Sequence, residues 1–90
     1  MQTVSIIISG KVQGVFFRQS TKEKAISLGI TGIVKNLPDG NVYIIASGTA
    51  AQLKTLIDWC RQGPARAKVT SIKTQEIALQ EFNNFSIERY

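Results

Sequence analysis

The chain opens on an apolar pattern of period two that predicts a β-strand over residues 3–9. Val4, Ile6 and Ile8 fall on one face of this strand, and Ile7 interrupts the more polar second face. One apolar face and one mixed face are typical of a half-buried central strand in a sheet.

After this strand the period lengthens to that of a helix. One face of the expected helix is formed by Phe17, Thr21, Ala25 and Leu28. Ser20 and Glu23 have the spacing of a capping box, which predicts that the helix begins near Ser20. Gly29 is a suitable residue for its C-terminal end.

Two β-rich runs follow, over residues 32–36 and 41–47, joined by the turn 37–40. Pro38 presets φ in this turn and Gly40 accepts a positive φ, so the two runs are predicted to form a hairpin. A second helix is expected after Thr49, which has capping-box spacing to Gln52, and before Gly63 and Pro64. Its apolar stripe consists of Leu53, Leu56, Ile57 and Cys60.

The remaining chain predicts a long strand over 69–79, bent or bulged where the alternation breaks at 74–76, and a short strand over 85–87. The order is β-α-β-β-α-β with a short extra C-terminal strand. It matches the ferredoxin-like α+β sandwich, an antiparallel sheet with two helices on one face. Residues 1–90, without a repeat or linker, are predicted to be one domain. Because this fold serves binders and enzymes alike, function must come from a site.

Composition restricts the chemistry of that site. Eleven Lys and Arg against six Asp and Glu give a net charge of +5, and five against one in residues 1–36 give +4. This excess favours anionic ligands, although a solvated basic face explains it as well. The absence of histidine excludes His-dependent catalysis and most zinc sites. One cysteine and no signal or long apolar segment predict a cytoplasmic protein without a membrane partner.

The segment Gly10–Arg18, GKVQGVFFR, is the candidate site. The first two strands of a βαβ unit run parallel, so this segment and Asn36 are expected at the same edge of the sheet. The segment leads into a helix N-terminus, where unpaired N–H groups attract anions. Gly10 and Gly14 allow successive N–H groups to converge on an anion, and Arg18 adds a guanidinium suited to phosphate.

The apolar residues of the segment have a supporting role in this hypothesis. Val12, Val15 and Phe17 are expected to bury its underside and hold the N–H groups in place. Taken singly, each residue of the segment is better explained by a turn, the core or the surface than by a ligand contact. Walker and GxGxxG motifs are absent. Cys60 lies on an apolar helix stripe, which favours a packed thiol over a nucleophile.

GKVQGVFFR resembles the first signature of acylphosphatases, Gly-x-Val-Gln-Gly-Val-x-Phe-Arg, at every fixed position. Residues 32–36, followed by Gly40, Val42 and Gly48, resemble the second signature. An aromatic residue more often follows the first glycine there, so Ile33 is a departure that is expected to alter packing beside the site. Further similarities, which extend the resemblance over nearly the whole chain, lie at Gly63, Pro64, Ala67, Val69, Phe85 and Ile87.

The resemblance implies hydrolysis of acyl phosphates to a carboxylate and inorganic phosphate without metal or other cofactor. Nothing in the sequence argues for more than a monomer. The phosphate would be held by Arg18 and by backbone N–H groups, while Asn36 would orient the attacking water. The implied N–H loop consists of Gln13, Gly14, Val15, Phe16 and Phe17. Because a carboxylate is a good leaving group, positioning and charge stabilisation suffice, without a covalent intermediate.

Two alternatives remain open. A basic ferredoxin-like domain could bind RNA on its sheet, but the RNP1-type pattern is missing and Tyr43 is one of few aromatic residues in the strands. Acylphosphatase-like domains also occur at the N-terminus of hydrogenase-maturation proteins that use carbamoyl phosphate. The chain length favours a stand-alone enzyme. A small-molecule acyl phosphate is the expected partner, and no nucleic acid is expected to bind.

Overall fold

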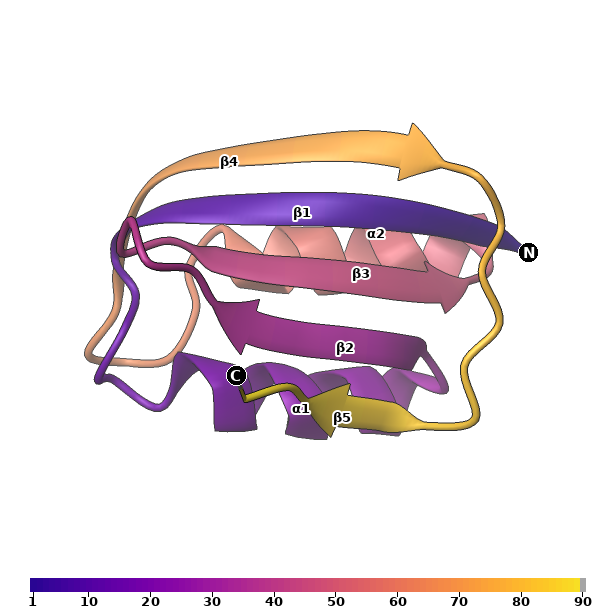
Figure 1. Ribbon diagram of the computed structural model, residues 1–90, viewed down its shortest axis with the longest axis horizontal. Helices are drawn as coiled ribbons and strands as arrows, with labels where there is room; N and C mark the ends of the chain where they lie inside the picture. The colour runs from indigo at the N-terminus through magenta and orange to yellow at the C-terminus, as the bar shows by residue number, and fades with distance from the viewer. Residues whose placement is uncertain (90) are drawn as a thin grey trace.

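The computed structural model describes residues 1–89 and has the predicted ferredoxin-like architecture (Figure 1). Its elements are β1 Gln2–Lys11, α1 Phe17–Leu28, β2 Thr31–Asn36, β3 Val42–Gly48, α2 Ala50–Cys60, β4 Lys68–Ile77 and β5 Phe85–Ile87. The sheet has the strand order β4-β1-β3-β2-β5, and Figure 1 shows both helices on one of its faces. In the described part of the chain, no helix is long and apolar enough to cross a membrane.

The sheet is antiparallel over its first four strands and mixed at one edge. β3 pairs antiparallel with both β1 and β2, so β1 and β2 run in the same direction. Their C-terminal ends therefore lie at the same edge of the sheet, as expected. β5 pairs parallel with β2, with Val34 opposite Ile87, and so also points toward that edge.

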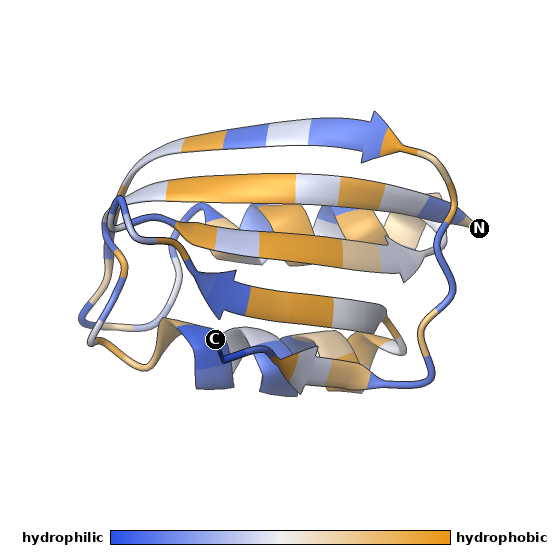
Figure 2. Ribbon diagram, viewed as in Figure 1, coloured by the Kyte–Doolittle hydropathy of each residue, from blue (hydrophilic) through white to orange (hydrophobic). Residues whose placement is uncertain are grey.

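The core lies between the helix-facing side of the sheet and the two helices. Ile6 and Ile8 of β1, Val34 of β2 and Ile44 of β3 are fully buried there. Figure 2 shows the hydrophobic residues concentrated along the middle of these three strands. α2 packs on β1 and β3, and α1 packs on β2 and β5. Burial of this apolar face holds the end of β2 in place beside the start of α1.

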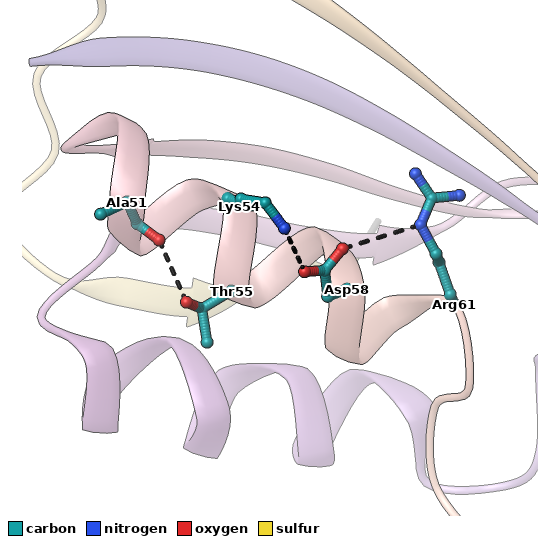
Figure 3. Close-up of polar contacts among 5 residues, drawn as sticks. All are labelled: Ala51, Lys54, Thr55, Asp58 and Arg61. Atoms are coloured by element: carbon teal, nitrogen blue, oxygen red, sulfur yellow. Dashed lines mark hydrogen bonds and ion pairs between the residues drawn. The ribbon is translucent and has the colours of Figure 1, made fainter.

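α2 forms as the sequence predicts. Thr49 and Gln52 make a complete capping box, and Leu53, Leu56 and Cys60 face the core. The outward face of the helix carries polar contacts that are drawn in Figure 3, among them an ion pair of 2.8 Å between Lys54 Nζ and Asp58 Oδ2.

The start of α1 differs from the prediction. The helix begins at Phe17, and the amide of Ser20, the expected N-cap, already donates to the carbonyl oxygen of Phe16 at 3.0 Å. The predicted capping box of Ser20 and Glu23 is therefore wrong. The side chain of Phe17 is buried against the core, so tertiary packing sets the N-cap at Phe16, four residues before the expected one.

The bulge expected in the fourth strand is absent from its predicted place. The β1–β4 register is continuous opposite residues 74–76. The register shifts instead between Ser9 and Gly10, where Gly10 pairs with Val69. Gly10 has φ of 124°, and a Cβ there would collide with the carbonyl oxygen of Lys68. The missing side chain therefore permits close contact between β1 and β4.

Candidate active site

A pocket of about 460 Å³ opens where the start of α1, the end of β2 and the segment after β5 come together. Figure 1 shows these three segments at one edge of the sheet. The pocket is lined by Val12, Gly14, Phe16, Phe17, Arg18, Gln19, Asn36, Ile87 and Arg89. The expected meeting of the GKVQGVFFR segment with Asn36 is thus observed. Gly10 lies outside the lining, in β1, and its predicted place in the anion-binding loop is wrong.

The underside of the loop is anchored as predicted. Val12, Val15 and Phe17 are only 1%, 4% and 1% exposed. The Phe17 ring packs against Trp59 with centroids 5.7 Å apart, and Gly63 leaves no room for a side chain beside it. These contacts hold the loop backbone in one conformation in the absence of ligand.

The first turn of α1 is left without the usual cap. Phe16 occupies the N-cap position with φ of 62° and makes no side-chain capping bond, and the first turn carries no acidic residue. Among residues 1–89, the N–H groups of residues 13–17 donate no hydrogen bond to the protein. Free N–H groups and the positive end of the helix dipole attract an anion at this point.

Arg18 lies in this same first turn and is half-buried. It makes no ion pair with any described residue. A cation at a helix N-terminus opposes the helix dipole, so this position does not serve the stability of α1. An anion in the pocket would be attracted by the guanidinium and by the free N–H groups together.

Asn36 contributes an oxygen without a partner. Its Oδ1 is buried and accepts no hydrogen bond within the described part of the chain. Leaving such an acceptor unpaired costs about 1–3 kcal/mol, unless a water or a ligand donates to it. Because Asn36 lines the same pocket as Arg18, a water bound to this oxygen would lie in the pocket that Arg18 lines.

The side chain of Gln13 connects the loop with the β2–β3 turn. Its Nε2 donates to the carbonyl oxygens of Leu37, at 2.8 Å, and Asn41, at 2.9 Å. Leu37 directly follows Asn36, so these bonds tie the backbone beside Asn36 to the loop. The sequence indicated only a backbone role for Gln13. A contact between residues that are 24 or more positions apart in the chain depends on the fold and has no local sequence signal.

Sequence reasoning also missed Ile87 and Arg89, which line the pocket from the C-terminal segment. The parallel pairing of Val34 with Ile87 brings this segment alongside the end of β2. Alternation then puts residue 89 on the same face as Asn36. A strand at 85–87 was predicted, and its parallel pairing with β2 is the information that would have revealed these residues. The pocket lining thus contains two arginines and no carboxylate.

The cysteine Cys60 lies outside the pocket lining. Burial raises the pKa of the Cys60 thiol to about 12, so it stays protonated at neutral pH, which agrees with the expected packed thiol. Within residues 1–89, no three His, Cys, Asp or Glu side chains form a group that could hold a metal ion.

Ile33 lies on the other face of the sheet. It pairs with Ile45 of β3 and is half-buried, whereas its neighbour Val34 is fully buried among the core residues. Alternation puts Asn36 on the same face as Val34. The expectation that Ile33 alters packing beside the site is therefore wrong, because the sheet separates it from the pocket.

Comparisons with known proteins agree with this description. The family model of acylphosphatases matches residues 4–87. An acylphosphatase of Marinobacter nauticus is 54% identical over 81 residues, which cover 89% of this chain and 88% of the relative. The crystal structure of acylphosphatase from Bacillus subtilis superposes with a TM-score of 0.96 at 36% identity, covering 99% of this chain and 100% of that chain.

A likeness to one larger protein was also found. The crystal structure of full-length HypF in its phosphate- and nucleotide-bound form superposes with a TM-score of 0.87 at 26% identity. The match covers 98% of this chain but only 12% of HypF. The same fold thus occurs inside a much longer chain. The signatures, the fold, the pocket and the family-model match agree, and the chain belongs to the acylphosphatase family.

Proposed function

We propose that this acylphosphatase holds the phosphate of its substrate with the backbone N–H groups of residues 13–17 and with Arg18, and that Asn36 orients the attacking water. Hydrolysis of an acyl phosphate to a carboxylate and inorganic phosphate is the activity of its family. One observation carries the assignment of roles. The uncapped start of α1, Arg18 and the unpaired oxygen of Asn36 line one pocket.

The proposed phosphate site matches the charge of the substrate. A phosphoryl group carries negative charge on its three outer oxygens, and this charge persists in the transition state. N–H donors that are fixed by the buried Val12, Val15 and Phe17 need no reorganisation when that charge shifts. The guanidinium of Arg18 can make two parallel contacts to phosphate oxygens, and no carboxylate in the lining competes for it.

The proposed reaction is a direct displacement by water. The water donates a hydrogen bond to Asn36 Oδ1 and attacks phosphorus, and the bond between phosphorus and the acyl oxygen breaks. The bonding electrons leave with the carboxylate. A carboxamide is not a strong base, so the water proton passes to an oxygen of the phosphate itself. The products are a carboxylate and dihydrogen phosphate, and no acid catalyst is needed for so good a leaving group.

The substrate is proposed to be a small-molecule acyl phosphate, hydrolysed by a cytoplasmic monomer without nucleic acid. In support, a single copy of the chain supplies the described lining of the pocket. Specific activity should therefore be independent of protein concentration. Light scattering should give the mass of one chain, and single-stranded RNA should not inhibit. A dimer that is required for activity would contradict this part of the proposal.

Hydrolysis of benzoyl phosphate in the presence of a metal chelator tests the proposal. The wild-type protein should turn over this substrate, and Arg18→Ala should lose nearly all activity while it retains its fold by circular dichroism. An Arg18→Ala variant with near wild-type turnover would refute the assignment of the site.

A second candidate function is use of carbamoyl phosphate within a larger assembly, and the likeness to a small part of HypF is the observation that favours it. Acetyl, benzoyl and carbamoyl phosphate should be compared under the same conditions. A kcat/KM for carbamoyl phosphate far above the other two would support the second candidate over the first.

A further inference from the structure

Phe16 combines two unfavourable features. Its side chain is 74% exposed, so the ring gains little from burial. Its φ of 62° lies in the left-handed region, and it is the one non-glycine residue among residues 1–89 with a positive φ. A bulky residue rarely adopts this conformation, whereas glycine adopts it without strain. An aromatic ring on a residue whose backbone conformation suits glycine points to a function of the ring itself.

Phe16 is an exposed residue between two buried ones and belongs to the pocket lining. Its neighbours Val15 and Phe17 are buried in the core, and Phe16 lines the pocket beside Arg18. Its backbone N–H belongs to the proposed phosphate loop. Phe16 is thus an exposed apolar residue in the pocket lining, within the segment whose N–H groups are proposed to hold the phosphate.

We propose that the phenyl ring of Phe16 is a contact surface for the acyl group of the substrate. It would favour acyl phosphates with an aromatic or extended apolar acyl group over acetyl phosphate. This inference rests on the proposed function, because it requires the phosphate to lie in the loop. While the phosphate is bound in the loop, the acyl group extends outward through the opening of the pocket. There a planar apolar group can pack on the exposed ring. Acetyl is too small to cover it.

The test compares kcat/KM for benzoyl and acetyl phosphate in wild type, Phe16→Gly and Phe16→Tyr. Both substrates carry the same phosphate, so general damage to the loop lowers both values and leaves their ratio unchanged. Phe16→Gly should lower the benzoyl-to-acetyl ratio about 3- to 10-fold, since one aromatic contact is lost. Phe16→Tyr retains the ring and should keep the ratio within about twofold of wild type.

Leu79→Ala is the matched control. Leu79 is another exposed apolar residue, at 59%, and it lies outside the pocket. Its replacement should change neither activity nor the ratio. A Phe16→Gly ratio equal to that of wild type would overturn the inference and leave the proposed function intact. Absence of turnover of either substrate by the wild type would overturn the proposed function, and the inference with it.

Inhibition of the wild-type enzyme provides a measurement that does not depend on a variant. Phenylphosphonate and methylphosphonate carry the same anionic group and differ in the apolar part. Phenylphosphonate should inhibit competitively with a Ki that is about 3- to 10-fold lower. Equal Ki values would contradict the inference even if Phe16→Gly did not fold.

Discussion

The N-termini of the two helices lie in one small domain and are built in opposite ways. At α2, Thr49 Oγ1 accepts from the Gln52 amide at 3.2 Å, and Gln52 Oε1 accepts from the Thr49 amide at 2.9 Å. At α1, Phe16 occupies the same position without a capping bond. The donors are thus satisfied within the protein at α2 and left available at α1.

The charged side chains of the two helices also differ in whether they have an ion-pair partner. Along α2, Asp58 contacts Lys54 and Arg61, as Figure 3 shows, and the hydrogen bond from Lys54 is the main cause that lowers the pKa of Asp58. At the start of α1, Arg18 has no described ion-pair partner and opposes the dipole. A cap is typically worth about 1 kcal/mol, and a misplaced helix-end charge about 0.3–1 kcal/mol. α1 therefore lacks the cap that α2 has at its N-terminus, and the proposed phosphate site lies at this uncapped end of α1.

The largest effect should come from removal of the charge at α1. Arg18→Ala should lower kcat/KM for benzoyl phosphate about 10²- to 10⁴-fold, because two charge-assisted contacts of about 1.5–3 kcal/mol each are lost. Arg18→Lys should recover little, since a point charge cannot make the paired contacts. Unfolding in urea should show unchanged or slightly higher stability. A marked loss of stability would mean that Arg18 is structural.

Arg61→Ala is the matched control on α2. Arg61 is exposed and contacts Asp58 at 3.9 Å. Exposed pairs of this kind contribute about 0–1 kcal/mol. Activity should remain at the wild-type level, so equal losses in the two arginine variants would remove the contrast between the helices.

Removal of the unpaired Asn36 oxygen at the end of β2 should give the next largest loss of activity. Asn36→Ala should lower kcat about 10²-fold, as expected when the attacking group is no longer held in position. Inhibition by inorganic phosphate should change less, because the phosphate is held elsewhere. Stability should not fall, since a buried unpaired acceptor is removed. A weaker phosphate affinity with unchanged kcat would show that Asn36 binds phosphate instead.

A smaller loss of activity is expected when the contact between Gln13 and the β2–β3 turn is broken. Gln13→Glu directs a carboxylate at the carbonyl oxygens of Leu37 and Asn41, to which Gln13 now donates. Displacement of Asn36 should lower kcat about tenfold and raise KM less. Gln62→Glu, on an exposed residue outside the pocket, is the control. A Gln13→Glu enzyme with wild-type kcat would show that Gln13 does not position Asn36.

Removal of the α2 cap should affect stability alone. Thr49→Ala should lower the free energy of unfolding by about 1 kcal/mol, which corresponds to a decrease of about 4–8 °C in Tm for a domain of this size. Benzoyl phosphate turnover at 25 °C should not change. Loss of turnover in this variant would contradict the separation of roles between the two helix ends.

The smallest effect expected is that of pH. Asn36 does not titrate, and burial keeps Cys60 protonated with a pKa of about 12. After correction for substrate ionisation, kcat/KM should be flat from about pH 5 to 9. An enzyme-derived titration near pH 6–7 would require a group outside this mechanism.

Agreement between the sequence and the structure is closest where the signal is local. The α2 capping box, the hairpin with Gly40 in its turn and the strand at 85–87 were all predicted and are present. The fold and the meeting of Arg18 with Asn36 follow from the order of such elements. Errors occurred where distant contacts decide, as at the start of α1, which packing of Phe17 sets, and at Gly10, which β4 approaches closely.

By itself, the sequence determined the element order and the two family signatures, because periodicity, caps and motifs are encoded within a few neighbouring residues. Only the tertiary structure decided what surrounds the pocket. It assigned the Gln13 side chain to the hairpin, added Ile87 and Arg89 to the lining, and left Phe16 exposed. These features depend on contacts between segments far apart in the chain, which no local pattern records.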